Sequence, residues 1–256
     1  MTILISLYGL LIGSFLNVCI YRIPKEESIV FPPSHCSNCN MRLKWYDLIP
    51  VFSFVFQRGK CRYCGEKISS QYLIIELLNA IIYLIIYKKF GFTLELFFYG
   101  FLFSLLIIIT IIDLKHMIIL DTLVILILAF SIMYKILSYL LYRKSPELLN
   151  SIGGLVLSGL FFILIILISK GGMGGGDVTL IGALGFILGI RNIFLAIFLS
   201  FTLGAIISIF LLITKIKGRK DPIPFGPFIV LGFFIVVFWG EELINWYMNI
   251  FFRSIV

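Results

Sequence analysis

The chain has 256 residues, of which 61% are hydrophobic and 13% are charged, and its formal net charge is +8. A soluble domain carries about 25% charged residues, and a disordered chain combines low hydrophobicity with high charge, so both classes are excluded. The composition therefore indicates an all-α, polytopic integral membrane protein. The basic residues form no dominant cluster, so we expect them to lie beside a lipid bilayer and expect no nucleic-acid partner.

Apolar runs long enough to cross a bilayer, which takes roughly 17–25 helical residues, recur along the chain. We predict about eight spans, at 2–21, 71–87, 93–112, 118–141, 151–169, 178–190, 193–214 and 223–248. The run 178–190 is the weakest, because it would rise only about 20 Å as a helix, against a hydrocarbon core of about 30 Å. Seven spans are therefore the alternative.

The distribution of Lys and Arg over the loops predicts the orientation of the chain. With eight spans, 14 of the 21 basic residues fall on one side and six on the other. The richer side is expected in the cytoplasm, which places the N-terminus outside. The run 2–21 lacks a basic start and a small-residue cleavage site, so we expect it to stay as a helix and not to leave as a signal peptide.

The one sizeable aqueous segment, 22–70, divides the chain into a first span (1–21), a cytoplasmic tetra-cysteine domain (22–70) and a multi-helix membrane domain (71–256). This segment contains two CxxC pairs with 21 residues between them, formed by Cys36, Cys39, Cys61 and Cys64. Four thiolates suit zinc in a closed, structural site. A reducing cytoplasm argues against disulfides, which remain the alternative together with free thiols.

Two acids stand at the ends of apolar runs. Asp113 follows LIIITII, and Asp177 follows the glycine tract GGMGGG. The predicted topology places both at the cytoplasmic edge, where an acid near the membrane usually faces a partner, a cavity or chemistry. Two convergent carboxyls suit an aspartyl protease, because an ionised one takes a proton from water while a protonated one donates to the scissile carbonyl. The simpler alternatives are an interfacial charge at Asp113 and a helix N-cap at Asp177.

Three further features accompany this pair. Gly174, Gly175 and Gly176 have no Cβ, so they allow a substrate strand to approach the carboxyl and permit positive φ. Asp121 is expected to be the N-cap of the span that follows it. Glu76, about five residues into its span, indicates either a site or a structural bond to a neighbouring helix.

Five motifs in order resemble the type IV prepilin peptidases, which are bacterial membrane aspartyl proteases of the GxGD type. They are GSFLNVCIYRIP (13–24), the cysteine segment CSNC…GEKIS (36–69), DLKHMIILD (113–121), GMGGGDVTL (172–180) and PIPFGPFI (222–229). The resemblance covers nearly the whole chain. Two positions depart from the family: Leu120 stands where Pro usually precedes the last Asp of the first motif, and Thr179 stands where Lys is common.

The resemblance implies an endopeptidase of the bacterial inner membrane, with Asp113 and Asp177 as catalytic residues. Such an enzyme cuts the basic leader from type IV prepilins or pseudopilins at the cytoplasmic face. The resemblance also implies N-methylation of the new N-terminal residue with S-adenosylmethionine, for which Asn17 and Glu76 are candidate site residues. The alternatives are a non-enzymatic scaffold of a secretion or competence machine, and a proton-coupled transporter that uses the two aspartates as a relay.

Overall fold

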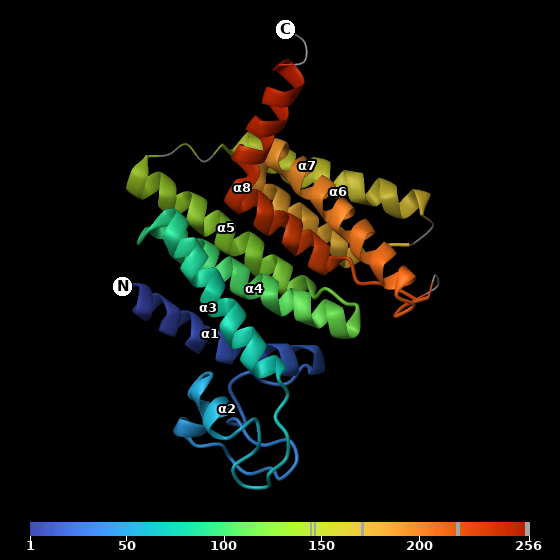
Figure 1. The fold of residues 1–256 in the computed structure, drawn as a ribbon. Coiled ribbons are helices and arrows are strands. Elements are labelled where there is room, and N and C mark those ends of the chain that lie inside the picture. The colour runs from blue at the N-terminus through green and yellow to red at the C-terminus, as the bar shows by residue number, and fades with distance from the viewer. Residues whose placement is uncertain (144, 146, 170–171, 219–220, 254–256) are drawn as a thin grey trace. The chain divides into compact units, whose positions relative to one another are not determined.

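The computed structural model describes residues 1–143, 145, 147–169, 172–218 and 221–253. All regular elements in this described part are helices, which confirms the predicted all-α class (Figure 1). The chain forms two compact units, Met1–Ile108 and Ile109–Val256, which are taken in turn below. Four basic residues that entered the orientation argument lie outside the described residues: Lys144, Lys170, Arg219 and Lys220.

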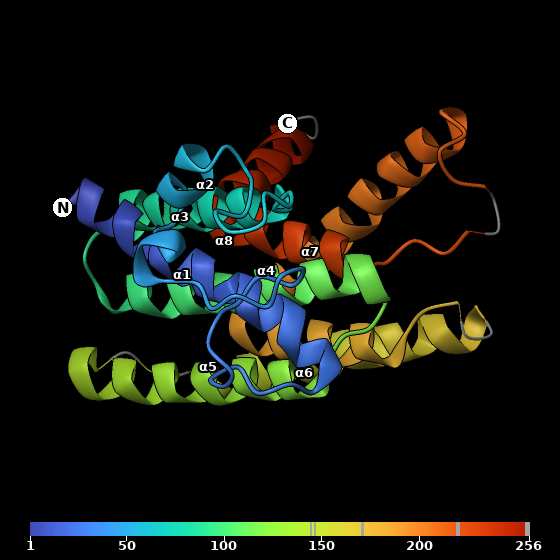
Figure 2. The same ribbon diagram turned by 90° about the horizontal axis from the view of Figure 1, so that it is seen from below.

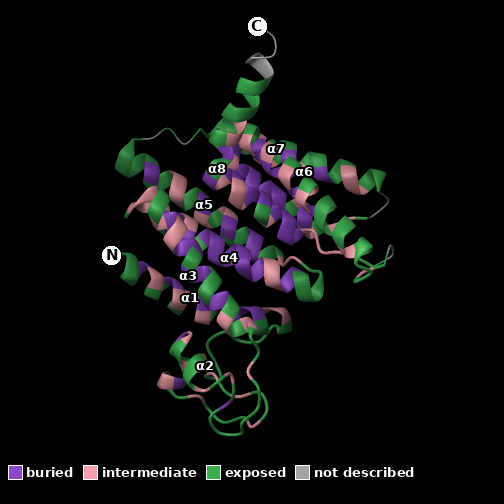
Figure 3. Ribbon diagram, in the orientation of Figure 1, coloured by how far each residue is buried: buried purple, intermediate pink, exposed green. Residues whose placement is uncertain are grey.

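The first unit contains α1 (Thr2–Arg22), α2 (Phe52–Phe56), α3 (Gln71–Phe90) and most of α4 (Leu94–His116). Helix α1 packs against α3 through two glycines, because a Cβ at Gly9 or Gly13 would lie 2.7 Å from the Cα of Ala80 or Glu76. Small residues let two membrane helices approach this closely. The side-chain amide of Asn79 then reaches across and donates to the Gly9 carbonyl at 2.7 Å. The segment between α1 and α3 carries the cysteines and is mostly exposed (Figure 3).

The second unit contains the end of α4, α5 (Asp121–Tyr142), α6 (Leu148–Ile168), α7 (Gly175–Ile213) and α8 (Gly226–Arg253). Helix α7 consists of two helical segments joined at Gly189, whose φ of 74° and ψ of 176° are not helical. The two segments run in different directions (Figure 2). This break falls where the predicted runs 178–190 and 193–214 meet. The first segment, 175–189, is about 22 Å long and so remains shorter than a typical hydrocarbon core.

Six helices of the described residues are long and apolar enough to cross a membrane. They are α1 with the turn that follows it (to Lys25), α4, α5, α6, α7, and α8 as far as Ile250. The chain is therefore a multi-pass membrane protein. The predicted count of eight spans is not confirmed, because α3 is not among the six and α7 counts once despite its kink.

Candidate active site

Asp113 lies in the last turn of α4 and is buried, with 5% of its surface exposed. Helix α4 ends because Met117 adopts a φ of 55°, and the N–H of Met117 donates to the Asp113 carbonyl at 2.8 Å. The carboxyl oxygen Oδ2 of Asp113 accepts a hydrogen bond at 2.9 Å from the N–H of Gly226, the first residue of α8. The carboxyl is thus held by the main chain of a segment far along the sequence.

Asp177 is the third residue of α7 and is also buried, with 8% of its surface exposed. Its Oδ2 accepts a hydrogen bond at 3.3 Å from the N–H of Gly174, which is the N-cap residue of α7. Asp177 is therefore not the N-cap expected as an alternative, but it closes the first turn of the helix from the third helical position. The carboxyl of Asp177 also interacts electrostatically with that of Asp113. The structure therefore brings together two acids that lie 64 residues apart in the sequence.

The three glycines before Asp177 differ in what surrounds them. A Cβ at Gly176 would lie 2.7 Å from the Cβ of Ile119, so this position requires glycine for close packing. A Cβ at Gly174 would stand 3.5 Å from Oδ2 of Asp177, and at Gly175 it would meet no atom within 4 Å among the described residues. None of the three has positive φ. Of the three glycines, only Gly176 therefore depends on the missing Cβ, and none uses the left-handed backbone that glycine also permits.

The expectation that Asp121 is an N-cap is wrong. Leu120 is the N-cap residue, and Asp121 is the first residue of α5. The Oδ1 of Asp121 instead accepts a hydrogen bond at 3.3 Å from the hydroxyl of Thr179, two residues after Asp177. Thr179 stands where lysine is common in the family that the motifs resemble. It still supplies a hydrogen-bond donor, and this bond connects α5 to α7 beside the acidic pair.

The four cysteines of the CxxC pairs form a cluster whose sulfur atoms all lie within 4.8 Å of one another. Each pair sits in a tight turn closed by an antiparallel bridge, His35–Arg42 in one case and Lys60–Lys67 in the other. The sulfurs of Cys36 and Cys64 are 3.8 Å apart. Tetrahedral zinc with bonds of about 2.3 Å places its sulfurs about 3.8 Å apart, so the donor set fits this metal.

The thiols of this cluster are free and not paired in disulfides. Hydrogen bonds from the backbone N–H groups of Cys39 and Asn38 lower the pKa of the Cys36 thiol to about 7. A thiolate is the form that binds a metal, so at least one ligand is ready near neutral pH.

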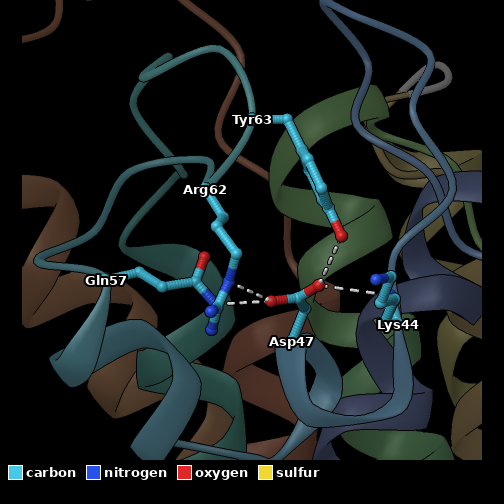
Figure 4. A network of polar contacts seen from close by, with 5 residues as sticks. All are labelled: Lys44, Asp47, Gln57, Arg62 and Tyr63. Atoms are coloured by element: carbon cyan, nitrogen blue, oxygen red, sulfur yellow. Dashed lines mark hydrogen bonds and ion pairs between the residues drawn. The ribbon is translucent and has the colours of Figure 1, made fainter.

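Asp47 holds the cysteine segment together, and sequence reasoning did not single it out (Figure 4). Its side chain is 1% exposed. Its Oδ1 accepts hydrogen bonds from Arg62 at 2.8 Å and Gln57 at 3.2 Å, and its Oδ2 accepts from the Lys44 N–H at 3.2 Å and the Tyr63 hydroxyl at 3.3 Å. These bonds connect the chain before α2 to the second CxxC pair. An isolated acid in WYDLIP carries no pattern that would have revealed them.

The two candidate cofactor residues lie in the first unit. Asn17 is 2% exposed, and its Nδ2 donates to the carbonyls of Gly13 and Tyr72 at 3.3 Å each. Its Oδ1 has no hydrogen-bond partner among the described residues. The Oε2 of Glu76 accepts from the N–H of Val51, the N-cap residue of α2, at 2.7 Å. The Glu76 carboxyl also accepts from the side chain of Ser14 on α1, so the structural bond to a neighbouring helix expected as an alternative exists.

Two family models match the chain. The Bacterial Peptidase A24 N-terminal domain matches residues 7–90, and the type IV leader peptidase family matches residues 100–209. The candidate cofactor residues and the cysteines fall in the first range, and both acids fall in the second.

Relatives match over almost the full length and are each named prepilin leader peptidase/N-methyltransferase. The relative from Bacillus subtilis (strain 168) is 35% identical over 246 residues, which cover 96% of this chain and 97% of the relative. That from Xanthomonas campestris pv. campestris is 34% identical, covering 94% and 92%, and that from Aeromonas salmonicida (strain A449) is 30% identical, covering 96% and 93%. No solved structure matches the chain. The agreement over both parts of the sequence shows that the chain belongs to the type IV leader peptidase family.

Proposed function

We propose that the chain is an endopeptidase that removes the basic leader of type IV prepilins or pseudopilins, with Asp113 and Asp177 as its catalytic pair. The observation that carries the proposal is that two buried carboxyls from different helices lie near enough to interact electrostatically. Two ionised carboxyls repel each other when they are close, so an arrangement that holds one proton between them is favoured. Relatives along 96% of the chain bear the name prepilin leader peptidase/N-methyltransferase.

The reaction needs these two carboxyls and a water molecule. The ionised member takes a proton from water as the water oxygen attacks the scissile carbonyl carbon, and the protonated member donates to the carbonyl oxygen. The carbon–nitrogen bond then breaks, and the leaving amine nitrogen takes up the proton that water gave. One hydroxyl of the tetrahedral intermediate returns its proton to the carboxyl that had donated, which restores the carbonyl and the catalytic pair. The open space beside Gly175 leaves room for a substrate strand next to Asp177.

We place this site at the cytoplasmic face of a bacterial inner membrane, with the N-terminus outside. The support is the excess of Lys and Arg in the loops on the side of the two acids. The basic leader of a prepilin would remain on that side while its apolar helix lies in the bilayer.

Removal of either carboxyl tests the peptidase. The full chain in proteoliposomes is given a synthetic peptide with a basic leader and an apolar segment, and the products are read by mass spectrometry. Asp113→Asn and Asp177→Asn should each abolish cleavage, because an amide can neither take nor give the proton. Asp221→Asn is the matched control, since this acid is exposed and caps a turn with the Gly218 N–H at 2.7 Å. Cleavage that persists in both active-site variants would reject the proposal.

We propose zinc as the metal of the four-cysteine cluster, with the structural role of holding the domain 22–70. Four thiolates leave no position for a substrate, so the metal stabilises the fold. Metal analysis of the purified chain should give about one zinc per molecule, and Cys61→Ser should lower this ratio. The exposed Ser69→Ala serves as a control within the same segment. Full zinc content in Cys61→Ser would contradict the assignment.

We propose further that the chain methylates the amine exposed by cleavage. S-adenosylmethionine would supply the methyl group. The buried Oδ1 of Asn17, which lacks a partner among the described residues, fits an N–H donor of such a cofactor. The carboxylate of Glu76 already accepts from the Val51 N–H and from the Ser14 side chain, so we assign it to shaping this region. The mass of the mature N-terminus, measured in the cleavage assay with the cofactor added, reports methylation directly.

A further inference from the structure

The start of α8 lies against one of the two acids. The Phe225 carbonyl accepts hydrogen bonds from the N–H groups of Phe228 and Ile229, at 3.0 and 3.2 Å, which marks the first turn of the helix. The first N–H groups of a helix have no partner within it. The N–H of Gly226 finds its partner in Oδ2 of Asp113, at 2.9 Å in a buried position.

Gly226 also has no room for a side chain. A Cβ at this position would lie 2.6 Å from Oδ2 of Asp113 and 3.2 Å from its Cγ. It would further lie 3.3 Å from Cδ1 of Ile119, the residue that packs against Gly176. Any residue larger than glycine at position 226 therefore has to displace the Asp113 carboxyl.

Aromatic packing fixes the place of this amide. The ring of Phe225 lies 5.0 Å from that of Phe201, 6.2 Å from that of Phe162 and 6.0 Å from that of Phe228, measured between centroids. These rings come from α6, α7 and α8, so three helices hold the residue just before Gly226. The donor is consequently part of a packed core of the second unit.

The two acids differ in where their donors come from. Asp177 is held by Gly174, three residues away on its own helix start. Asp113 is held by Gly226, which is 113 residues away and outside the range 100–209 that the type IV leader peptidase model matches. The orientation of the Asp177 carboxyl is therefore set by neighbouring residues in the chain, whereas the orientation of the Asp113 carboxyl depends on the packing of α8 against it.

From these contacts we infer that the Gly226 amide is a positioning group for Asp113, an inference that rests on the proposed peptidase function. The N–H occupies a lone pair of Oδ2 and fixes the carboxyl plane. A proton carried by Asp113 then sits on Oδ1, from which it can be passed to the substrate carbonyl or shared with Asp177. Helix α8 thereby completes the catalytic pair without contributing a side chain to it.

Two variants test the inference in the reconstituted full chain. Gly226→Ala adds the Cβ that collides with Oδ2 and keeps the N–H. Gly226→Pro adds the same Cβ and also removes the N–H, at a helix position where proline is well tolerated. Gly240→Ala is the control on the same helix, since its methyl group would meet the side chain of Val236 one turn earlier. A displaced catalytic group can cost about 10²-fold in rate. We expect kcat to fall about 10²-fold in both Gly226 variants, while KM stays near that of Gly240→Ala.

A second readout needs no cleavage. The Asp177→Asn chain is labelled with isotopes at its aspartates, and its infrared spectrum is recorded. Subtraction of the spectrum of the Asp113→Asn/Asp177→Asn double variant leaves the carboxyl band of Asp113. Gly226→Pro in the Asp177→Asn chain should shift this carboxyl band. An unshifted band, or full kcat in Gly226→Ala, would overturn the inference. If the unaltered chain cleaves no leader peptide, the proposed function fails, and the infrared band still decides whether Gly226 holds Asp113.

Discussion

A carboxylate buried in a small domain needs enough donors to replace the water that it has lost. Asp47 has four donors, from both sides of α2 and from the second CxxC pair. The side chain of its ion-pair partner Arg62 is 51% exposed, so the charge attraction itself contributes little. Asp47 instead acts through the hydrogen bonds that it collects, and these take the place of an apolar core in an exposed segment.

Asp47→Ala should destabilise the tetra-cysteine domain by about 1–3 kcal/mol, because the buried donors around it lose their acceptor. The measurements are the rate of proteolysis within 22–70 and the rate at which a chelator removes the proposed zinc, both of which should rise. Glu66→Ala removes the same charge from an exposed position in the same domain and is the control. Equal rates in the two variants would show that Asp47 has no such role.

At the residue scale, sequence reasoning succeeds where a polar group breaks an apolar or repeated pattern. Asp113 and Asp177 end apolar runs, and the cysteines carry their own spacing. Gly226 and Asp47 show no such signal, because their importance arises from partners that are distant in sequence or irregularly spaced. The catalytic roles of the two acids and the cofactor roles of Asn17 and Glu76 stay predictions.

At the scale of helices, close backbone approach explains how α1 and α3 pair. A side chain at Gly13 would meet the Cα of Glu76, which belongs to the backbone and cannot rotate away. The pairing also places Asn79 beside the Gly9 carbonyl, where its hydrogen bond adds to the packing. Glycine at these positions therefore stabilises the fold, although glycine inside an isolated helix is unfavourable.

Gly13→Ala should lower the thermal midpoint of the purified chain, by an overpacking cost of about 1–3 kcal/mol. Gly159→Ala makes the same chemical change within α6, where the added Cβ meets nothing within 4 Å among the described residues. This control should leave the midpoint unchanged or raise it slightly, because alanine favours helix. A Gly13→Ala chain as stable as the control would contradict the close-packing argument.

Helix positions follow from apolar runs to within a few residues. The predicted run 93–112 begins one residue before α4 and stops four residues short of its end, and the run 118–141 begins three residues before α5 and stops one residue short of its end. The number of crossings does not follow in the same way. Length and hydropathy cannot reveal the positive φ of Gly189 that divides α7, because that angle depends on how the segment packs. The predicted domain boundaries at residues 21 and 70 separate membrane helices from an aqueous segment. These boundaries stay a prediction.

At the scale of the whole molecule, the kink in α7 decides the side on which every later residue lies. If its two segments each cross the bilayer, five crossings separate the loop at Phe92 from the loop at Gly218. If α7 crosses once, four crossings separate them, and both loops lie on the same side. The orientation predicted from Lys and Arg requires five.

Single cysteines at these loops distinguish the two arrangements. Phe92→Cys should react with a membrane-impermeant thiol reagent in intact cells, whereas Gly218→Cys should react only in inverted vesicles. Both positions are exposed in the structure. The background carries Cys19→Ala and keeps the four-cysteine cluster, and the same background without either new cysteine gives the blank. Labelling of both positions from one side would show that α7 crosses once.

The donors that hold the two acids belong to the main chain, and every residue type except proline supplies an amide N–H. Mutation can therefore exchange most neighbouring side chains without removing a donor. Two positions must instead remain glycine. A Cβ at 226 would collide with Asp113, and a Cβ at 176 would collide with Ile119. Such a centre can tolerate many substitutions around it, provided that positions 226 and 176 stay without a side chain.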